Sequence, residues 1–146
     1  MPVKIVIKGL DRVSGKFTAI YKKFDTFLED TTLQVVIYVH SKIPRYPPQP
    51  PTSKYRRTGT LGRTVTSLMG KAPSALSRVE SMNGDVTGFV GTNLSYAFRV
   101  IDEDNQTKVH KRNGWWTLQE VVTSLRAGIK RKYETELRKF LKKEYP

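Results

Sequence analysis

The sequence predicts an α+β fold, in which a mostly antiparallel sheet carries helices packed on one face. Asn83-Gly84 separates two strand-like segments, 75–82 and 85–90, and this dipeptide favours the two-residue type I′ turn of a β-hairpin. Apolar residues then recur at helical spacing through 118–141, which indicates a long C-terminal helix. A chain of 146 residues can bury one core, so we expect a single domain spanning 1–146.

The composition is strongly basic. The chain has 26 Lys and Arg against 13 Asp and Glu, a formal net charge of +13. This charge favours an anionic partner such as nucleic acid, an acidic protein surface or anionic lipid, although solvated helix faces also account for many cations. The chain has no cysteine, which excludes disulfides, thiolate zinc sites and cysteine nucleophiles. It shows neither a signal peptide nor an apolar run long enough for a membrane span, so we expect an intracellular product without a membrane partner.

The N-terminal segment predicts a strand followed by a helix. Val3–Ile7 is rich in β-branched residues, and its flanking lysines favour an edge strand. Asp11 is placed to cap a helix. The apolar residues that would form one face of that helix are Val13, Phe17, Ile20, Tyr21 and Phe24.

A second, buried helix is predicted over 27–42. Thr26 and Glu29 have the spacing of a capping box, and apolar residues keep helical spacing up to Pro44. Residues 33–39 are β-branched and aromatic and would favour a strand by propensity alone. We predict a helix because the spacing of the apolar residues outweighs the β propensity of residues 33–39.

A Pro-rich, basic segment follows, which we expect to project from the domain as a stiff arm over about 44–60. Its prolines fix φ and bias the residues before them toward extended backbone. Gly59 and Gly62 permit a tight turn where the arm ends. A rigid basic arm suits binding better than catalysis. The arm and its flanks carry Pro47, Pro48, Pro50 and Pro51, with Arg45, Lys54, Arg56, Arg57 and Arg63.

The middle of the chain is expected to be mostly β. Residues 63–69 are assigned to a strand, and the hairpin of 75–90 follows. Ser95–Phe98 is typical of a short helical turn. Residues 102–114 are polar and lack periodicity, so we expect a loop there.

The C-terminal helix is predicted to begin after Thr117, which forms a capping box with Glu120. Its apolar stripe comprises Leu118, Val121, Val122, Leu125, Ile129, Tyr133, Leu137, Phe140 and Leu141. The opposite face carries Arg126, Lys130, Arg131, Lys132, Arg138, Lys139, Lys142 and Lys143. That face is either simply solvated or packs along an acidic neighbour or DNA phosphates.

The residues that could support catalysis form weak patterns. His40 lies in an apolar run, and His110 lies among cations that favour its neutral form. Asp102, Glu103 and Asp104 could hold a hard cation or belong to a nuclease site, but a solvated loop explains them as well. We therefore predict no enzyme activity, no catalytic residues, no cofactor and no metal site.

Trp115 and Trp116 immediately precede the predicted helix cap. One ring is expected to be buried as a hydrophobic staple. Because adjacent residues cannot both face one core, the other ring is expected to serve as an interface anchor or a base-stacking platform. No stacking motif surrounds the pair, which favours a protein interface at Trp115.

Three segments, taken in order, resemble a known family. They are YPPQPPTSKYRRTGTLGRTV (46–65), GFVGTNLSYAF (88–98) and GWWTLQEV (114–121). They are similar to the small tail-completion, or head–tail joining, neck proteins of long-tailed bacteriophages and prophages. The chain departs from many members at 98–101 and in the acidic loop that follows.

This resemblance implies a non-enzymatic virion protein, assembled in the host cytoplasm and located in the neck of the tail. Such proteins form a ring, usually a hexamer, at the head-proximal end of the tail tube and help join the tail to the DNA-filled capsid. The implied partners are further copies of the chain, the head-closure or connector protein, the tail terminator or tail tube protein, and DNA passing through the lumen.

The resemblance also implies a role for the arm. A ring needs heterologous interfaces, and a rigid arm that reaches the next subunit provides one at little ordering cost. The expected subunit-interface residues are Tyr46, Pro47, Pro48, Pro50, Pro51, Tyr55 and Trp115. Arg56, Arg57 and Arg63 are expected to contact acidic groups of a neighbour or DNA in the lumen. A tail terminator or head-closure protein, a free nucleic-acid-binding protein and a nuclease remain alternatives.

Overall fold

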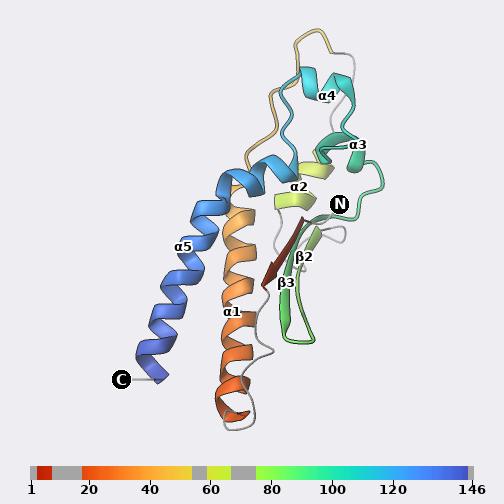
Figure 1. The fold of residues 1–146 in the computed structure, drawn as a ribbon. Helices are drawn as coiled ribbons and strands as arrows, with labels where there is room; N and C mark the ends of the chain where they lie inside the picture. The colour runs from red at the N-terminus through yellow and green to blue at the C-terminus, as the bar shows by residue number, and fades with distance from the viewer. Residues whose placement is uncertain (1–2, 8–17, 54–58, 67–74, 145–146) are drawn as a thin grey trace.

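The computed structural model describes residues 3–7, 18–53, 59–66 and 75–144 (Figure 1). The elements in chain order are β1 (Val3–Ile7), α1 (Thr18–Lys42), α2 (Thr60–Thr66), β2 (Ala75–Met82), β3 (Asp85–Thr92), α3 (Phe98–Ile101), α4 (Lys108–Arg112) and α5 (Leu118–Glu144). Helices combined with an antiparallel sheet confirm the predicted α+β class.

The sheet has the strand order β1-β3-β2 in the described residues, and both pairings are antiparallel. β2 and β3 form the predicted hairpin. Its turn residues Asn83 and Gly84 have φ of 53° and 82°, and a type I′ turn requires positive φ at both positions. β1 pairs with β3, with Val3 opposite Val90, so it is the expected edge strand.

One continuous helix, α1, replaces the two helices predicted for the N-terminal half. It passes through Thr26, whose Oγ1 donates a hydrogen bond to the carbonyl oxygen of Lys22 at 3.0 Å. A mid-helix threonine can bond back to the preceding turn in this way, so the predicted capping box of Thr26 and Glu29 was wrong. Asp11, the predicted cap of the first helix, lies outside the described residues.

The β-branched segment of α1 is helical, as its spacing predicted. Val35, Val36 and Val39 are fully buried, whereas Leu33 and Ile37 are 38% and 43% exposed. This alternation follows the helical period. Packing of one helix face therefore outweighs the β propensity of the individual residues.

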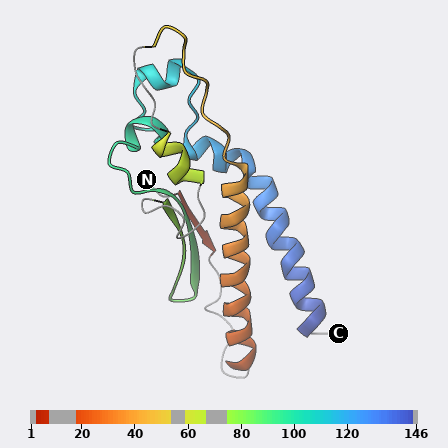
Figure 2. The ribbon, with the colours of Figure 1, turned by 180° about the vertical axis from the view of Figure 1, so that it is seen from behind.

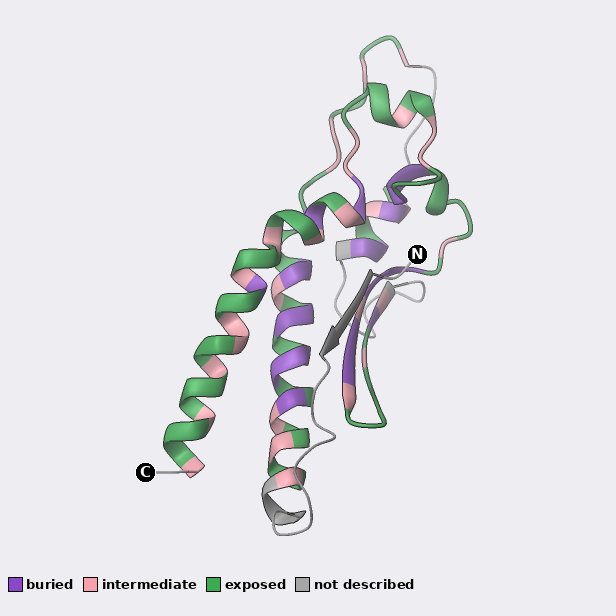
Figure 3. Cartoon of the chain, in the orientation of Figure 1, coloured by how far each residue is buried: buried purple, intermediate pink, exposed green. Residues whose placement is uncertain are grey.

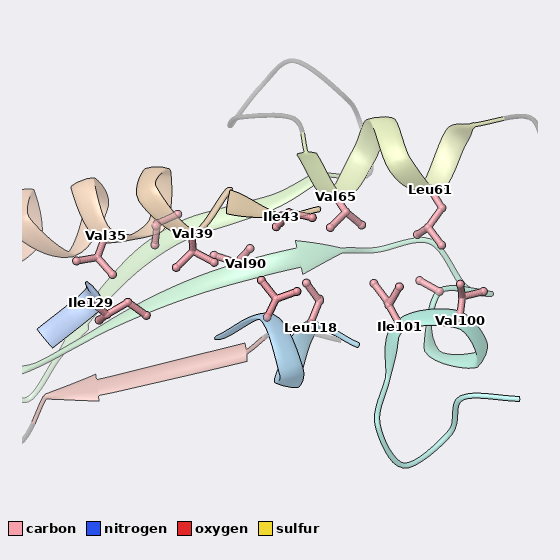
Figure 4. Packing of buried hydrophobic residues seen from close by; sticks show 13 residues of the cluster. Val35, Val39, Ile43, Leu61, Val65, Val90, Val100, Ile101, Leu118 and Ile129 are labelled. Carbon is pink, nitrogen blue, oxygen red and sulfur yellow. The ribbon is translucent and has the colours of Figure 1, made fainter. Parts of the chain in front are cut away.

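α1 lies close against the sheet because β3 places a glycine at the contact. A Cβ added at Gly88 would lie 2.7 Å from Val36 Cγ2 and 3.1 Å from Thr32 Cγ2. Glycine therefore permits a helix–sheet approach that a side chain would obstruct. The buried apolar cluster around this contact (Figure 4) comprises Val35, Val36, Val39, Ile43, Leu61, Val65, Val90, Ala97, Val100, Ile101, Leu118, Val121 and Ile129.

α5 runs alongside α1, which therefore has α5 on one side and the sheet on the other (Figure 2). The hydroxyls of Thr32 and Tyr133 form a hydrogen bond of 2.9 Å between the two helices. At the start of α5, the backbone N–H of Thr117 donates to Glu120 Oε2 at 2.7 Å, and the Glu120 N–H donates to Thr117 Oγ1 at 3.1 Å. The predicted capping box of this helix is confirmed.

The apolar stripe of α5 is buried only in part. Leu118, Val121 and Ile129 are buried, but Leu137 and Leu141 are 37% and 45% exposed. Figure 3 shows that exposed residues dominate the C-terminal turns of α5, whereas buried residues recur along α1. Beyond the middle of the helix the leucines of the predicted stripe are therefore exposed, whereas Phe140 still stacks on Phe27 of α1, with ring centroids 4.7 Å apart.

The segment predicted as a strand over 63–69 begins instead within a helix, α2, and residues 67–69 lie outside the described ranges. Leu61, Thr64 and Val65 are buried, whereas Arg63 is exposed. This i, i+3, i+4 spacing fits one face of a helix, because adjacent residues of a strand such as Thr64 and Val65 would point to opposite faces. Gly59 adopts a φ of 70° and accepts a hydrogen bond from the Arg63 N–H at 3.0 Å. This glycine therefore shapes the entry into the helix.

The polar segment 102–114 also differs from the prediction, because it contains the short helix α4. Its capping residue Thr107 has extended backbone and accepts a hydrogen bond from the Lys111 N–H at 3.1 Å. No residue of α4 is buried. Because α4 has only five residues and none of them is buried, its sequence shows no apolar periodicity that would predict a helix.

Candidate protein-interface site

The Pro-rich arm lies beside α4 at the end of the molecule opposite the C-terminus (Figures 1 and 2). Its described part leaves α1 at Ile43 and runs in irregular conformation to Ser53. The Ser53 N–H donates to the Pro50 carbonyl oxygen at 3.0 Å, and Gln49 Nε2 donates to the Ser53 carbonyl oxygen at 3.3 Å. The tip of the arm is therefore a hydrogen-bonded turn with a defined shape.

Tyr46 anchors the arm to the rest of the chain. Its ring stacks on that of Trp116, with centroids 4.8 Å apart and planes 3° from parallel. It also contacts Trp115, with centroids 4.5 Å apart and planes inclined by 33°. On the side of α2, Gly62 leaves room for Tyr46, because an added Cβ would lie 3.2 Å from Tyr46 Cε2. We call Tyr46, Trp115 and Trp116 the aromatic anchor.

The segment that carries the two tryptophans is itself fixed by hydrogen bonds. Gln106 Nε2 donates to the carbonyl oxygens of Val100 and Trp115, at 2.7 and 3.0 Å. The Trp115 N–H donates to the His110 carbonyl oxygen at 3.1 Å, and the two rings meet edge to face with centroids 4.9 Å apart. His110 Nδ1 lies 2.6 Å from Thr107 Oγ1. This network holds the backbone and ring of Trp115 in place beneath Tyr46.

The anchor is held by packing rather than by polar contacts. The hydroxyl of Tyr46 and Nε1 of Trp116 are buried, and neither has a hydrogen-bond partner among the described residues. Burial, together with Tyr96, raises the pKa of Tyr46 well above its usual value of 10. Unpaired buried donors weaken stability, so the stacking and apolar contacts of the rings must more than offset that cost.

The structure brings together some of the residues predicted to form an interface and not others. Pro48 and Pro51 are exposed at the tip of the arm, whereas Pro47 and Pro50 are half-buried. Tyr46 and Trp115 meet each other within one chain. Their predicted contact with a neighbouring subunit stays a prediction. Tyr55, Arg56 and Arg57 lie outside the described residues.

Arg63 is exposed on α2, below the arm. Its Nη2 donates to Thr60 Oγ1 at 3.3 Å, within the same helix. The guanidinium is therefore near the base of the arm, on a surface that a neighbour or nucleic acid can reach. Its predicted contact with an acidic neighbour or with DNA stays a prediction.

Asp102 has a structural role. It is fully buried, and its Oδ1 accepts hydrogen bonds from the N–H groups of Asp104 and Asn105 at 3.0 and 3.1 Å and from Asn105 Nδ2 at 2.9 Å. These contacts close the turn that follows α3. Glu103 and Asp104 are exposed. In the described part of the chain, no group of His, Asp and Glu residues is arranged to hold a metal ion.

The exposed cations of α5 are partly paired. Lys139 lies 2.7 Å from Glu136, Lys130 lies 3.8 Å from Glu134, and Lys23 of α1 lies 2.6 Å from Glu144. These are surface ion pairs and contribute little to stability. The helix nevertheless keeps a strong positive excess along its outer face.

Sequence reasoning missed that Trp116 and Gly62 contact Tyr46. These residues come from three separate parts of the chain, and no local spacing connects an aromatic ring to a partner so distant in sequence. The Trp-Trp pair was the one usable indication, because it predicted that at least one ring packs internally. The expectation that the two adjacent rings cannot share one contact was wrong, since both are half-buried and both pack on Tyr46.

No protein-family model, curated protein or solved structure matches this chain. Within the described ranges, none of the helices combines the length and apolar character required to cross a bilayer.

Proposed function

We propose that this chain is a structural protein of the bacteriophage neck, which forms a ring at the head-proximal end of the tail tube and helps join the tail to the DNA-filled capsid. The sequence resemblance suggests the class. The observation that supports it best in the structure is the anchored arm. A Pro-rich segment is stacked onto the loop before α5, and its exposed tip is presented away from the core.

This geometry suits docking between proteins. Proline fixes φ, and the aromatic anchor fixes the base of the arm, so little conformational freedom remains to be lost when a partner binds. Exposed Pro48 and Pro51 offer apolar surface without flexible side chains. Arg63, exposed on α2 at the base of the arm, adds a cation to this part of the chain, which favours an acidic partner.

Electron microscopy of lysates tests the proposal, using the parent phage with this gene deleted. Full heads beside complete, unattached tails are expected. Overlong or irregular tubes would instead identify a tail terminator, and normal infectious particles would contradict any structural role in the neck.

Complementation of that deletion tests the arm itself. Because Tyr46 belongs to the aromatic anchor, it stays in place while Pro47, Pro48, Pro50 and Pro51 are changed together to Ser. The variant is expected to fold and to fail in joining. Lys111→Ala, at an exposed position of the neighbouring α4, serves as the control and is expected to complement. Equal complementation by both variants would remove the arm from the proposal.

A second candidate is a free nucleic-acid-binding protein, which the cationic outer face of α5 favours. It predicts that the purified chain binds DNA or RNA with an affinity that falls steeply as salt rises. Mobility-shift titration at several salt concentrations distinguishes the two, since a ring component needs no appreciable affinity as a single chain.

A further inference from the structure

The outer face of α1 carries an exposed stripe that is both apolar and acidic. Leu33 and Ile37 are one turn apart and are 38% and 43% exposed. Glu29 and Asp30 lie one turn before Leu33 and are exposed, and Asp30 is at the edge of this face, where it also lines the groove between α1 and α5. In the described part of the chain, neither carboxylate takes part in an ion pair. We call these four residues the acidic stripe.

The outer flank of α5 carries the converse arrangement. Leu137 and Leu141 are also one turn apart and are 37% and 45% exposed. Arg138 and Lys142 are exposed beside them, and with Leu141 they line a shallow groove on the surface of the helix. Neither cation has an ionic partner among the described residues. We call Leu137, Arg138, Leu141 and Lys142 the basic stripe.

We propose that the acidic stripe of one copy docks on the basic stripe of a second copy. Each stripe pairs two exposed apolar side chains at i and i+4 with two charges of one sign, so apolar surface and opposite charges meet together. Contact between two acidic or two basic stripes would instead place like charges in the same interface, which is unfavourable.

The same contact can form again between each successive pair of copies. Each copy presents both stripes, and the stripes differ, so the interface is heterologous and joins copies in series. It deepens the proposed function, and it rests on that proposal for the reason why copies associate in a ring. It also assigns to the two helices a part of the subunit interface that lies away from the arm.

Disulfide trapping tests the contact in the full chain, which has no cysteine of its own. Ile37→Cys and Leu141→Cys are purified separately, mixed in equal amounts and oxidised. The expected product is a mixed dimer that joins one chain of each variant, in clear excess over dimers of either variant alone. Val109→Cys replaces Leu141→Cys as the control, since it is 54% exposed on α4 and outside both stripes. A yield no greater than this control, or like-with-like dimers in equal amount, overturns the proposal.

Charge reversal tests whether the opposite charges of the two stripes are needed for the contact. Adding Arg138→Glu and Lys142→Glu to the Leu141→Cys chain is expected to lower the yield of mixed dimer by about tenfold. Adding Glu29→Lys and Asp30→Lys to the Ile37→Cys chain should then restore it. Lys108→Glu with Lys111→Glu on α4 is the matched control and should leave the yield unchanged. Equal losses from both reversals, or no rescue, overturn the proposal.

The phage experiment tests the neck function and the trapping experiment tests the contact between copies, so a negative result in one does not decide the other. A joining defect without mixed dimers leaves the neck function standing and removes this contact. Mixed dimers without a joining defect establish the contact and remove the neck function.

Discussion

α1 and α5 are helices of similar length, 25 and 27 residues, but they use their surfaces differently. α1 lies between the sheet and α5, and Val35, Val36 and Val39 are completely buried. α5 is buried up to Ile129 and then exposes its leucines. An apolar stripe in the sequence therefore predicts a contact but not the partner of that contact. The buried valines of α1 have their partner in the same chain. Leu137 and Leu141 of α5, like the exposed residues on the outer face of α1, have apolar surface left for another molecule.

Introducing a carboxylate is expected to give the largest difference in stability between a position on α1 and a position on α5. Val39→Asp places an unpaired charge in the core and should lower the free energy of unfolding by more than about 4 kcal/mol, enough to prevent folding. Leu141→Asp, the same type of change at a surface position of α5, should alter it by less than about 0.5 kcal/mol. Urea denaturation followed by circular dichroism compares them. Similar losses in both variants would contradict the distinction.

The close approach of α1 to the sheet predicts the next largest effect. Gly88→Ala places a methyl group against Val36, which is buried and has little rotamer freedom in a helix, so we expect a loss of about 1–3 kcal/mol. Ser81→Ala, at an exposed position of the same hairpin, is the control and should be nearly neutral. Chemical denaturation measures both. If Gly88→Ala proved as stable as the parent, α1 would not be held as tightly as we infer.

The beginning of α5 should respond to loss of its cap. Thr117→Ala removes the hydroxyl that accepts from the Glu120 N–H and should lower the free energy of unfolding by about 1 kcal/mol. Thr123→Ala makes the same chemical change at an exposed position inside α5 and should have no destabilising effect. Equal destabilisation by the two would show that the capping box contributes nothing beyond helix propensity.

The smallest expected effect concerns His40, near the end of α1, and is a change in how the free energy of unfolding depends on pH. The side chain is 4% exposed, and neither ring nitrogen has a hydrogen-bond partner among the described residues. Burial lowers the pKa of His40 below 6.5, and the nearby Val65 backbone offsets only part of that shift.

The direction of the pH effect follows from which state binds the proton first. As pH falls through about 6.5, the unfolded chain takes up the proton before the folded chain, so the free energy of unfolding decreases from there down to the lowered pKa. His40→Leu should lose that part of the pH dependence. Thermal denaturation between neutral and mildly acidic pH measures it, and an unchanged slope in His40→Leu would place its cause elsewhere.

The features that the sequence predicted correctly depend on local chemistry. Asn83-Gly84 dictates its turn because both residues tolerate positive φ, and Thr117 with Glu120 satisfies helix N–H groups that have no other partner. The valine spacing of α1 was sufficient to identify a helix. These decisions involve residues within a few positions of one another.

The incorrect predictions concern segments whose local sequence is compatible with more than one conformation. Thr26 can cap a helix or bond back into one, and continuous burial along α1 selected the second possibility. Residues 63–69 were assigned to a strand, but Leu61, Thr64 and Val65 are buried at the i, i+3, i+4 spacing of the helix α2. The aromatic anchor joins Tyr46 to Trp115 and Trp116 across about half of the chain, and no sequence spacing contains that information.

The pairing of β1 with β3 has a consequence for folding during synthesis. Val3 lies opposite Val90, so the first strand has no partner until that residue has been made. At about 5–20 residues per second, this delay is on the order of four to seventeen seconds. The valine face of α1 is made later and lacks its sheet for a shorter interval, until Gly88 has been added. The nascent chain therefore carries an unpaired strand and an uncovered helix, and the hairpin of β2 and β3 is the element whose emergence ends that exposure.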